Sequence, residues 1–148
     1  MYQRILVPVD GSSTAQRGLK EAIGLARLMH AHLCLLHVVD AYPLLGEMAS
    51  VSSVDEYQRE LHRHGERVLL QAASAAAEAG VSAQQISRDS VRQRVSDVIT
   101  EEAVKSGCDL IVMGTHGRRG FARFTLGSDA ERVLRHCTVP VLVVRDAG

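Results

Sequence analysis

The sequence predicts an α/β fold, in which one doubly wound, five-stranded parallel sheet with strand order 3-2-1-4-5 carries helices on both faces. Three observations predict it. Short, continuous apolar runs recur along the chain, as expected of strands that are buried on both faces. Helical patterns lie between these runs, and such alternation implies parallel strands joined by right-handed crossovers. The length of 148 residues suits one globular domain, which we expect to span residues 1–148.

The first strand is predicted in the apolar run Ile5–Val9. Pro8 has no N–H to donate to a neighbouring strand, so it should lie at the carboxyl end of this strand, where pairing has ended. The segment Ser13–Gln16 has the S-x-x-Q form of a capping box, which predicts a helix start. Apolar residues at helical spacing then continue the helix to about Met29 or His30.

The middle of the chain predicts a buried strand at Leu33–Val39 and a long helix at Asp55–Ala79, which Gly80 ends. Residues 41–54 have no convincing period and predict a flexible connection. A weaker strand is expected within Val81–Val91, near the edge of the sheet.

The carboxyl-terminal third predicts a helix with Val95, Val98, Ile99 and Ala103 on its inner face, ending at Gly107. The most apolar strand follows, and a further helix and a last strand complete the fold. Their expected bounds are Leu110–Met113, about Ser128–His136, and Val139–Val144 with Pro140 at its beginning.

Composition excludes several classes of function. Acidic and basic residues balance at 17 each, so no overall field draws the protein to nucleic acid or to an anionic membrane. No apolar run approaches the ~20 residues of a membrane span, and the amino terminus lacks a signal-peptide pattern. The three cysteines are odd in number and form no C-x-x-C pair, which argues against disulfides and structural zinc. We expect a soluble, cytoplasmic protein.

The segment Gly114–Ser128 carries the main functional signal. Four of its residues are glycine, and it leaves a strand and opens a helix. Glycine allows close approach of the backbone, and the N–H groups of a helix start favour an anion. The glycine spacing is neither the dinucleotide fingerprint nor the P-loop. Ligands of doubly wound sheets bind where the strand order reverses, which places Pro8–Gly11 beside this segment, between strands one and four.

The same segment resembles a known family. Residues Gly114-x2-Gly117-x9-Gly127-Ser128 match the G-x2-G-x9-G-[ST] signature of the ATP-binding branch of the universal stress proteins. The resemblance spans the whole chain and implies a Rossmann-like fold of the adenine nucleotide alpha hydrolase type. Its other matching segments are Ile5–Ser12, Leu36–Asp40, Asp109–Gly114 and Pro140–Val144.

The resemblance implies a homodimer that binds ATP and acts in stress responses. It places Asp10 against the ribose and the backbone of Val38 against the adenine. Phosphate oxygens would be held near Gly127 and Ser128, with Mg²⁺ or Mn²⁺ bridging them, and the final strand Val141–Val144 would pair across the dimer axis. The candidate ATP-binding residues are Pro8, Val9, Asp10, Val38, Met113, Gly114, His116, Gly117, Arg118, Gly127, Ser128 and Asp129.

Some of these residues have simpler interpretations. Ser128 and Glu131 also form an S-x-x-E capping box, which satisfies a helix start without a ligand. Asp10 also suits a turn, and His116 is better interpreted as a loop histidine bonded to nearby backbone. The sequence departs from the family pattern at Asp129, where a neutral residue is frequent. Another departure is Val91–Arg94, where a Gly-x-Pro type of turn is common.

Three further interpretations concern chemistry. Phe121 and Phe124 are expected to anchor their loop rather than to stack on nucleic acid, and which of Arg118, Arg119 and Arg123 meets phosphate stays open. The pairs His30-x-His32 and His62-x-His64 are interpreted as surface residues rather than metal ligands.

No nucleophile with a paired base and no P-loop lysine is evident in the sequence. We therefore expect a nucleotide-binding signalling protein rather than a dedicated enzyme, with slow ATP hydrolysis left open. The alternative is a dimeric protein-interaction module that uses no nucleotide. Bulky replacements of Gly117 and Gly127 would distinguish the two, because only the first function depends on the glycine segment for a ligand.

Overall fold

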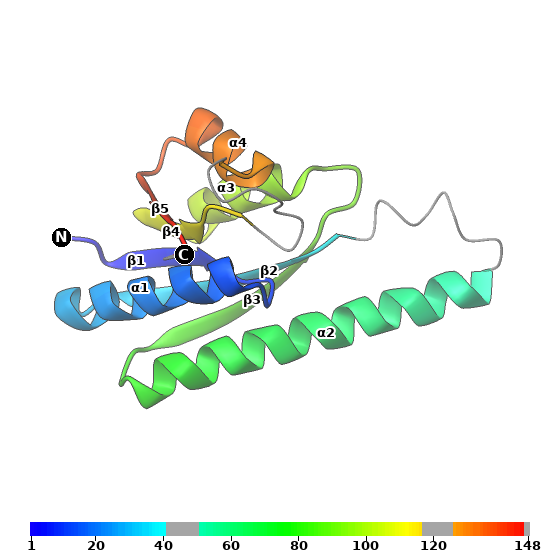
Figure 1. The fold of residues 1–148 in the computed structure, drawn as a ribbon, viewed down its shortest axis with the longest axis horizontal. Helices are drawn as coiled ribbons and strands as arrows, with labels where there is room; N and C mark the ends of the chain where they lie inside the picture. The colour runs from blue at the N-terminus through cyan, green and yellow to red at the C-terminus, as the bar shows by residue number, and fades with distance from the viewer. Residues whose placement is uncertain (41–50, 117–125, 147–148) are drawn as a thin grey trace.

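The computed structural model describes residues 1–40, 51–116 and 126–146 (Figure 1). Five parallel strands form one sheet in the order β3-β2-β1-β4-β5, which confirms the predicted order. The strands are β1 (Arg4–Pro8), β2 (His32–Val39), β3 (Ala83–Asp89), β4 (Leu110–Gly114) and β5 (Val141–Val144). Strand β3 is an edge strand, as its weak pattern predicted.

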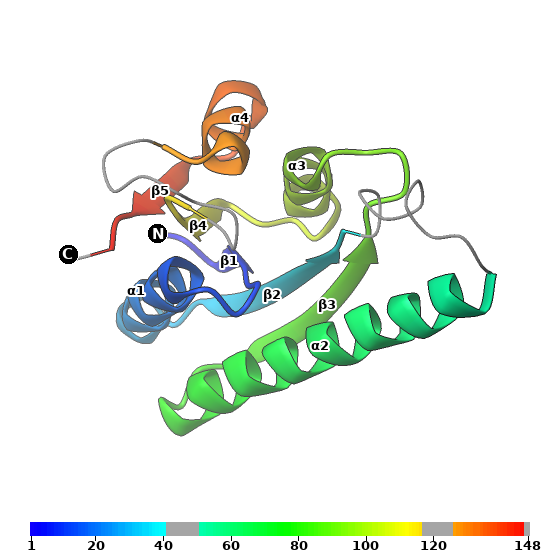
Figure 2. The ribbon, with the colours of Figure 1, turned by 45° about the vertical axis from the view of Figure 1, so that its right-hand side comes forward.

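Four helices cover the sheet within the described residues: α1 (Ser13–Met29), α2 (Val51–Glu78), α3 (Val95–Lys105) and α4 (Ser128–His136). Helices α1 and α2 lie on one face and α3 and α4 on the other (Figure 2). The predicted cover on both faces is therefore confirmed.

Alternate residues of the strands pack into two separate hydrophobic cores, one on each face of the sheet. Ile5, Val7 and Leu35 pack under α1 and α2, whereas Leu6 and Leu36 pack under α3 and α4. All five side chains are fully buried. Burial on both faces explains why these strands are continuous apolar runs without alternation.

Two predicted helix starts were wrong, and the last strand begins at Val141 rather than at the predicted Val139. The cap of α1 is Ser12, whose side chain accepts a hydrogen bond from the backbone N–H of Ala15 at 3.2 Å, so the capping residue precedes the predicted Ser13. Helix α2 begins at Val51, within the segment predicted to be a connection. Serine and valine have low helix propensity, so the sequence pattern does not indicate this first helical turn. The rest of that connection lies outside the described residues.

The amino-terminal half of α2 is tied to the end of β3 by His62. Its Nε2 lies 3.1 Å from the Asp89 carboxylate, and its Nδ1 hydrogen-bonds the Gln58 carbonyl at 2.7 Å. The hydrogen bond to Gln58, followed by the charge of Asp89, raises the pKa of His62 above its ordinary value. His62 is thus a surface residue with a structural partner.

Among the described helices, none combines the length and the apolar composition that crossing a bilayer requires.

Candidate functional site

The loops that follow β1 and β4 meet at one place. The Thr14 hydroxyl at the start of α1 donates a hydrogen bond to the His116 carbonyl. On the other side, the Gly127 N–H before α4 donates to the Thr115 carbonyl at 2.7 Å. The β1–α1 turn, the end of β4 and the start of α4 are therefore held together. This confirms that the two segments singled out in the sequence lie side by side.

The shape of this junction depends on glycine for reasons inside the protein. A Cβ added at Gly114 would lie 2.6 Å from the Thr14 carbonyl oxygen, and one at Gly127 would lie 2.6 Å from the Thr115 carbonyl oxygen. Both distances are shorter than side chains tolerate. Close packing of backbone on backbone therefore accounts for these two glycines, and their presence alone does not require a ligand.

The residue that caps α4 contributes no side-chain hydrogen bond to the start of the helix. Gly127 is the capping residue and Ser128 is the first helical residue, so the capping box predicted from Ser128 and Glu131 was wrong. A glycine cap has no side-chain oxygen that could accept from the first N–H groups. Glu131 instead pairs with Arg135 one turn along, at 2.9 Å. The amino end of α4 thus keeps the character of an anion site, with Asp129 as the acidic residue nearest its start.

The backbone of Val38 faces the crevice beyond the end of β1. The neighbouring Val39 carbonyl accepts from the Ser90 N–H at 3.0 Å, on the β3 side of β2. Successive residues of a strand direct their backbone groups to opposite sides, so those of Val38 face β1. Strand β1 pairs with β2 only as far as Pro8 and Leu36. The N–H and carbonyl of Val38 consequently lie past the end of that ladder.

Gly114 occupies the corresponding position on β4. The Thr115 N–H donates to the Val144 carbonyl on the β5 side, at 3.0 Å, so the backbone groups of Gly114 face β1. Val38 and Gly114 therefore flank the end of β1 from opposite sides, which is the arrangement expected at a switch point.

The other candidate residues in the described part of the chain make contacts within the protein. Pro8 ends β1 as predicted. Val9 uses its N–H for the Leu36 carbonyl and its own carbonyl for His37, both at 2.8 Å, so its backbone is engaged within the protein. Met113 is buried in the core beneath α3 and α4. Asp10 accepts from the Ser12 N–H at 2.9 Å, which is the predicted turn role.

His116 is bonded locally, as expected. Its Nδ1 lies 3.1 Å from the Thr115 hydroxyl, and its carbonyl accepts from Thr14. Its Nε2 is buried and has no hydrogen-bond partner among the described residues. Gly117, Arg118 and the rest of residues 117–125 lie outside the described residues, and so do their predicted contacts.

Sequence reasoning missed the glycines on the helices. A Cβ at Gly18 of α1 would lie 3.2 Å from the Gly114 nitrogen, and one at Gly65 of α2 would lie 2.6 Å from the His37 ring. That ring is buried, lies 6.0 Å from the His64 ring, and donates to Val9. Glycine inside a helix costs about 1 kcal/mol relative to alanine, so Gly18 and Gly65 were detectable signals of close packing.

The cysteines are free, and two of them form a polar contact on the opposite face of the sheet from α1. Cys34 is fully buried and accepts from the Arg4 guanidinium at 3.3 Å. A hydrogen bond from Cys108 is the main reason that the pKa of Cys34 falls to about 7, with Arg4 adding to it against the effect of burial. Among the described residues, no group of three histidine, cysteine or acidic side chains could hold a metal ion.

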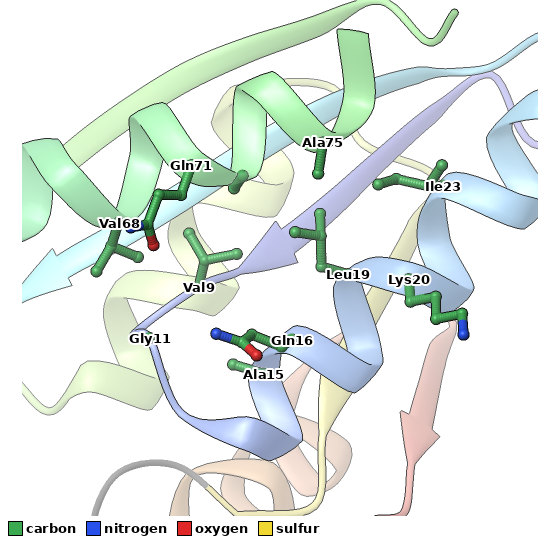
Figure 3. Close-up of a pocket in the computed structure, with 11 residues that line it drawn as sticks. Val9, Gly11, Ala15, Gln16, Leu19, Lys20, Ile23, Val68, Gln71 and Ala75 are labelled. Carbon is green, nitrogen blue, oxygen red and sulfur yellow. The ribbon is translucent and has the colours of Figure 1, made fainter. Parts of the chain in front are cut away.

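A pocket that the sequence did not predict lies between α1 and α2. Its volume is about 310 Å³, and Figure 3 shows the side chains that line it. It is on the α1–α2 face, whereas the switch point lies at the carboxyl edge of the sheet. The β1–α1 turn and the first turns of α1 border both.

Comparison with known proteins agrees with this fold and identifies the family. A sequence model of the universal stress protein family matches residues 1–145. The chain belongs to the universal stress protein family. Universal stress protein MJ0531 of Methanocaldococcus jannaschii is 35% identical over 145 residues, covering 98% of this chain and 83% of that protein.

Solved structures share the fold. The protein MJ0577 has a TM-score of 0.86 at 28% identity, over 100% of this chain and 99% of its own. A universal stress protein family member from Burkholderia pseudomallei has a TM-score of 0.77 at 34% identity, over 98% of this chain and 97% of its own. The resemblance identified from the glycine signature is therefore confirmed at the level of the family.

Two more distant structures contain adenine nucleotides and share the fold with this chain. The universal stress protein of Archaeoglobus fulgidus was solved in complex with dAMP; it has a TM-score of 0.71 at 24% identity, over 97% of this chain and 98% of its own. An Arabidopsis thaliana family member was solved with AMP bound. It has a TM-score of 0.70 at 18% identity, over 98% of this chain and 93% of its own.

Proposed function

We propose that this universal stress protein binds ATP across the carboxyl end of β1. The observation that carries the proposal is the pair of backbone groups that flank this end: Val38 on β2, and the glycine-capped start of α4 next to β4. Val38 offers one donor and one acceptor, which suits the edge of an adenine ring. The amino end of α4 suits the phosphates. Family members that contain dAMP and AMP support the class of ligand.

The remaining contacts follow from the same placement. Asp10 lies in the turn after β1, between the two ends of the proposed nucleotide, where its carboxylate can accept from ribose hydroxyls. Asp129 would repel phosphates unless a cation lies between them. Mg²⁺ is commonly held by phosphate oxygens, waters and one or two carboxylates, so Asp129 fits such a cation without a complete protein-built metal site.

We propose a binding protein rather than an enzyme, one that signals in stress responses through its occupied or empty state. The Thr14 hydroxyl, a group that could act as a nucleophile, lies at the edge of the site. It is buried and donates its proton to a hydrogen bond with the His116 carbonyl. Occupancy would instead be transmitted through the junction of α1, β4 and α4, because both loops that border the nucleotide belong to it.

Calorimetric titration of nucleotide-free protein tests this function. We expect one ATP per chain with Mg²⁺, weaker binding when Mg²⁺ is replaced by a chelator, and no comparable binding of GTP, whose ring edge reverses the donor and acceptor of adenine. Protein that gives no heat with ATP, ADP or AMP, after removal of any co-purified nucleotide, would refute the proposal.

We also propose that β5 pairs with β5 of a second copy. Strand β5 is an edge of the sheet, and Leu142 on it is 38% exposed. Long apolar edges are normally paired or covered. Light scattering at micromolar concentration should therefore give about twice the chain mass of 16.1 kDa. A monomeric mass, unchanged when ATP is added, would contradict the dimer and leave the nucleotide proposal intact.

A further inference from the structure

The pocket between α1 and α2 has the size and composition of a small-ligand site. Its volume of about 310 Å³ is at the lower end of the range for such sites. Most of the side chains that line it are aliphatic, and they come from the β1–α1 turn, α1 and α2: Val9, Ala15, Leu19, Ile23, Val68, Ala72 and Ala75. In Figure 3, Leu19 and Ala75 point toward one another across its interior.

Polar groups occupy only part of its wall. Gln16 and Lys20 come from α1 and Gln71 from α2, and all three side chains are exposed. Lys20 is the one charged residue among the described residues that line the pocket. In Figure 3 the amides of Gln16 and Gln71 lie toward the Gly11 end, while the Lys20 ammonium turns outward at the Ile23 end.

We propose that this pocket binds an amphipathic monocarboxylate, a short- to medium-chain fatty acid, with the alkyl chain between α1 and α2 and the carboxylate at the rim beside Lys20. Aliphatic walls exclude a sugar or a nucleotide, whose many polar groups would lose water without partners. A single cation at the rim, with no acidic side chain among the described lining residues to oppose it, is complementary to a single negative charge. The exposed Lys20 side chain needs only a change of rotamer to reach it.

The proposal is independent of nucleotide binding, although the two sites are neighbours. Val9 and Gly11 line the pocket and flank Asp10 in the turn after β1. Gly11 has a positive φ of 83°, and a Cβ on it would contact Val68 of α2 at 3.4 Å. The turn is thus packed against the α2 wall of the pocket.

A chain-length series of hexanoate, octanoate and octanol, titrated into the nucleotide-free full-length protein by calorimetry, tests the inference. Each buried methylene is worth about 0.8 kcal/mol, so octanoate should bind roughly tenfold more tightly than hexanoate. Octanol, which lacks the charge, should bind more weakly than octanoate. Equal affinities for hexanoate and octanoate, or no binding of either, would overturn the proposal.

Two matched pairs of variants locate the site. Ala75→Phe fills the pocket and should abolish octanoate binding, whereas Ala77→Phe, at an exposed position of the same helix, should leave it unchanged. Lys20→Gln should reduce octanoate affinity to that of octanol, whereas Arg17→Gln, outside the lining, should not. If Ala75→Phe does not fold, Ala75→Leu makes a smaller filling of the same space. Octanoate binding that survives filling would place it elsewhere and contradict the inference.

Discussion

Replacing Gly127 with alanine is expected to lower the free energy of unfolding by about 1–3 kcal/mol. The new Cβ would lie 2.6 Å from the Thr115 carbonyl oxygen and 3.3 Å from the His116 Cα, and both neighbours are backbone atoms that cannot rotate away. The start of α4 must therefore move off the end of β4. Urea denaturation measures the loss, and ATP affinity should fall with it because the phosphate-facing N–H groups move too.

Gly24→Ala is the matched control for this substitution. Gly24 lies within α1, and a Cβ added there would have no neighbour within 4 Å among the described residues. Alanine is preferred to glycine in a helix, and this variant should gain about 0.5–1 kcal/mol. If Gly127→Ala were as stable as the original protein, the close packing of α4 on β4 would be wrong.

Replacing Arg88 with methionine is expected to cost about 3 kcal/mol of stability, because it leaves a buried carboxylate without its cation. Glu102 of α3 is only 4% exposed, and the Arg88 guanidinium reaches its two oxygens at 2.8 and 3.3 Å. The Ser106 hydroxyl donates to the same carboxylate at 2.6 Å. One hydroxyl cannot replace the lost positive charge, so the transition in urea should shift to lower concentration.

The double variant Arg88→Met with Glu102→Leu separates the lost charge from lost packing. Removing both charges leaves no uncompensated ion, so most of the stability should return. A double variant as unstable as Arg88→Met alone would show that the arginine stabilises β3 and α3 through its aliphatic stem instead.

The strand order could be predicted because hydrophobicity is strongly patterned in buried parallel strands. Leu6 and Val7 face opposite cores and are both fully buried, so the run is apolar throughout and easily detected. Helix starts carry weaker information. Ser12 and Ser13 are chemically identical candidates for the cap of α1, and only the backbone conformation decides that Ser12 is used.

The place of the site was predictable, but the reason for its glycines was not. Topology and glycine density both pointed to the edge between β1 and β4, where the structure has the two loops in contact. The contacts of Gly114 with Thr14 and of Gly127 with Thr115 are backbone packing between separate elements, which no local pattern encodes. Bulky substitution at Gly127 consequently disturbs fold and site together and cannot by itself distinguish nucleotide binding from a structural role.

A backbone amide spectrum recorded with and without ATP and Mg²⁺ avoids that difficulty, because it leaves the sequence unchanged. The amides of Val38, Gly114 and Ser128 should shift together on saturation, as they flank the end of β1 on both sides. The amides of Ile23 and Ala75, in the α1–α2 pocket, should shift far less. An unchanged spectrum at Val38 and Ser128, or shifts confined to that pocket, would contradict nucleotide binding at the switch point.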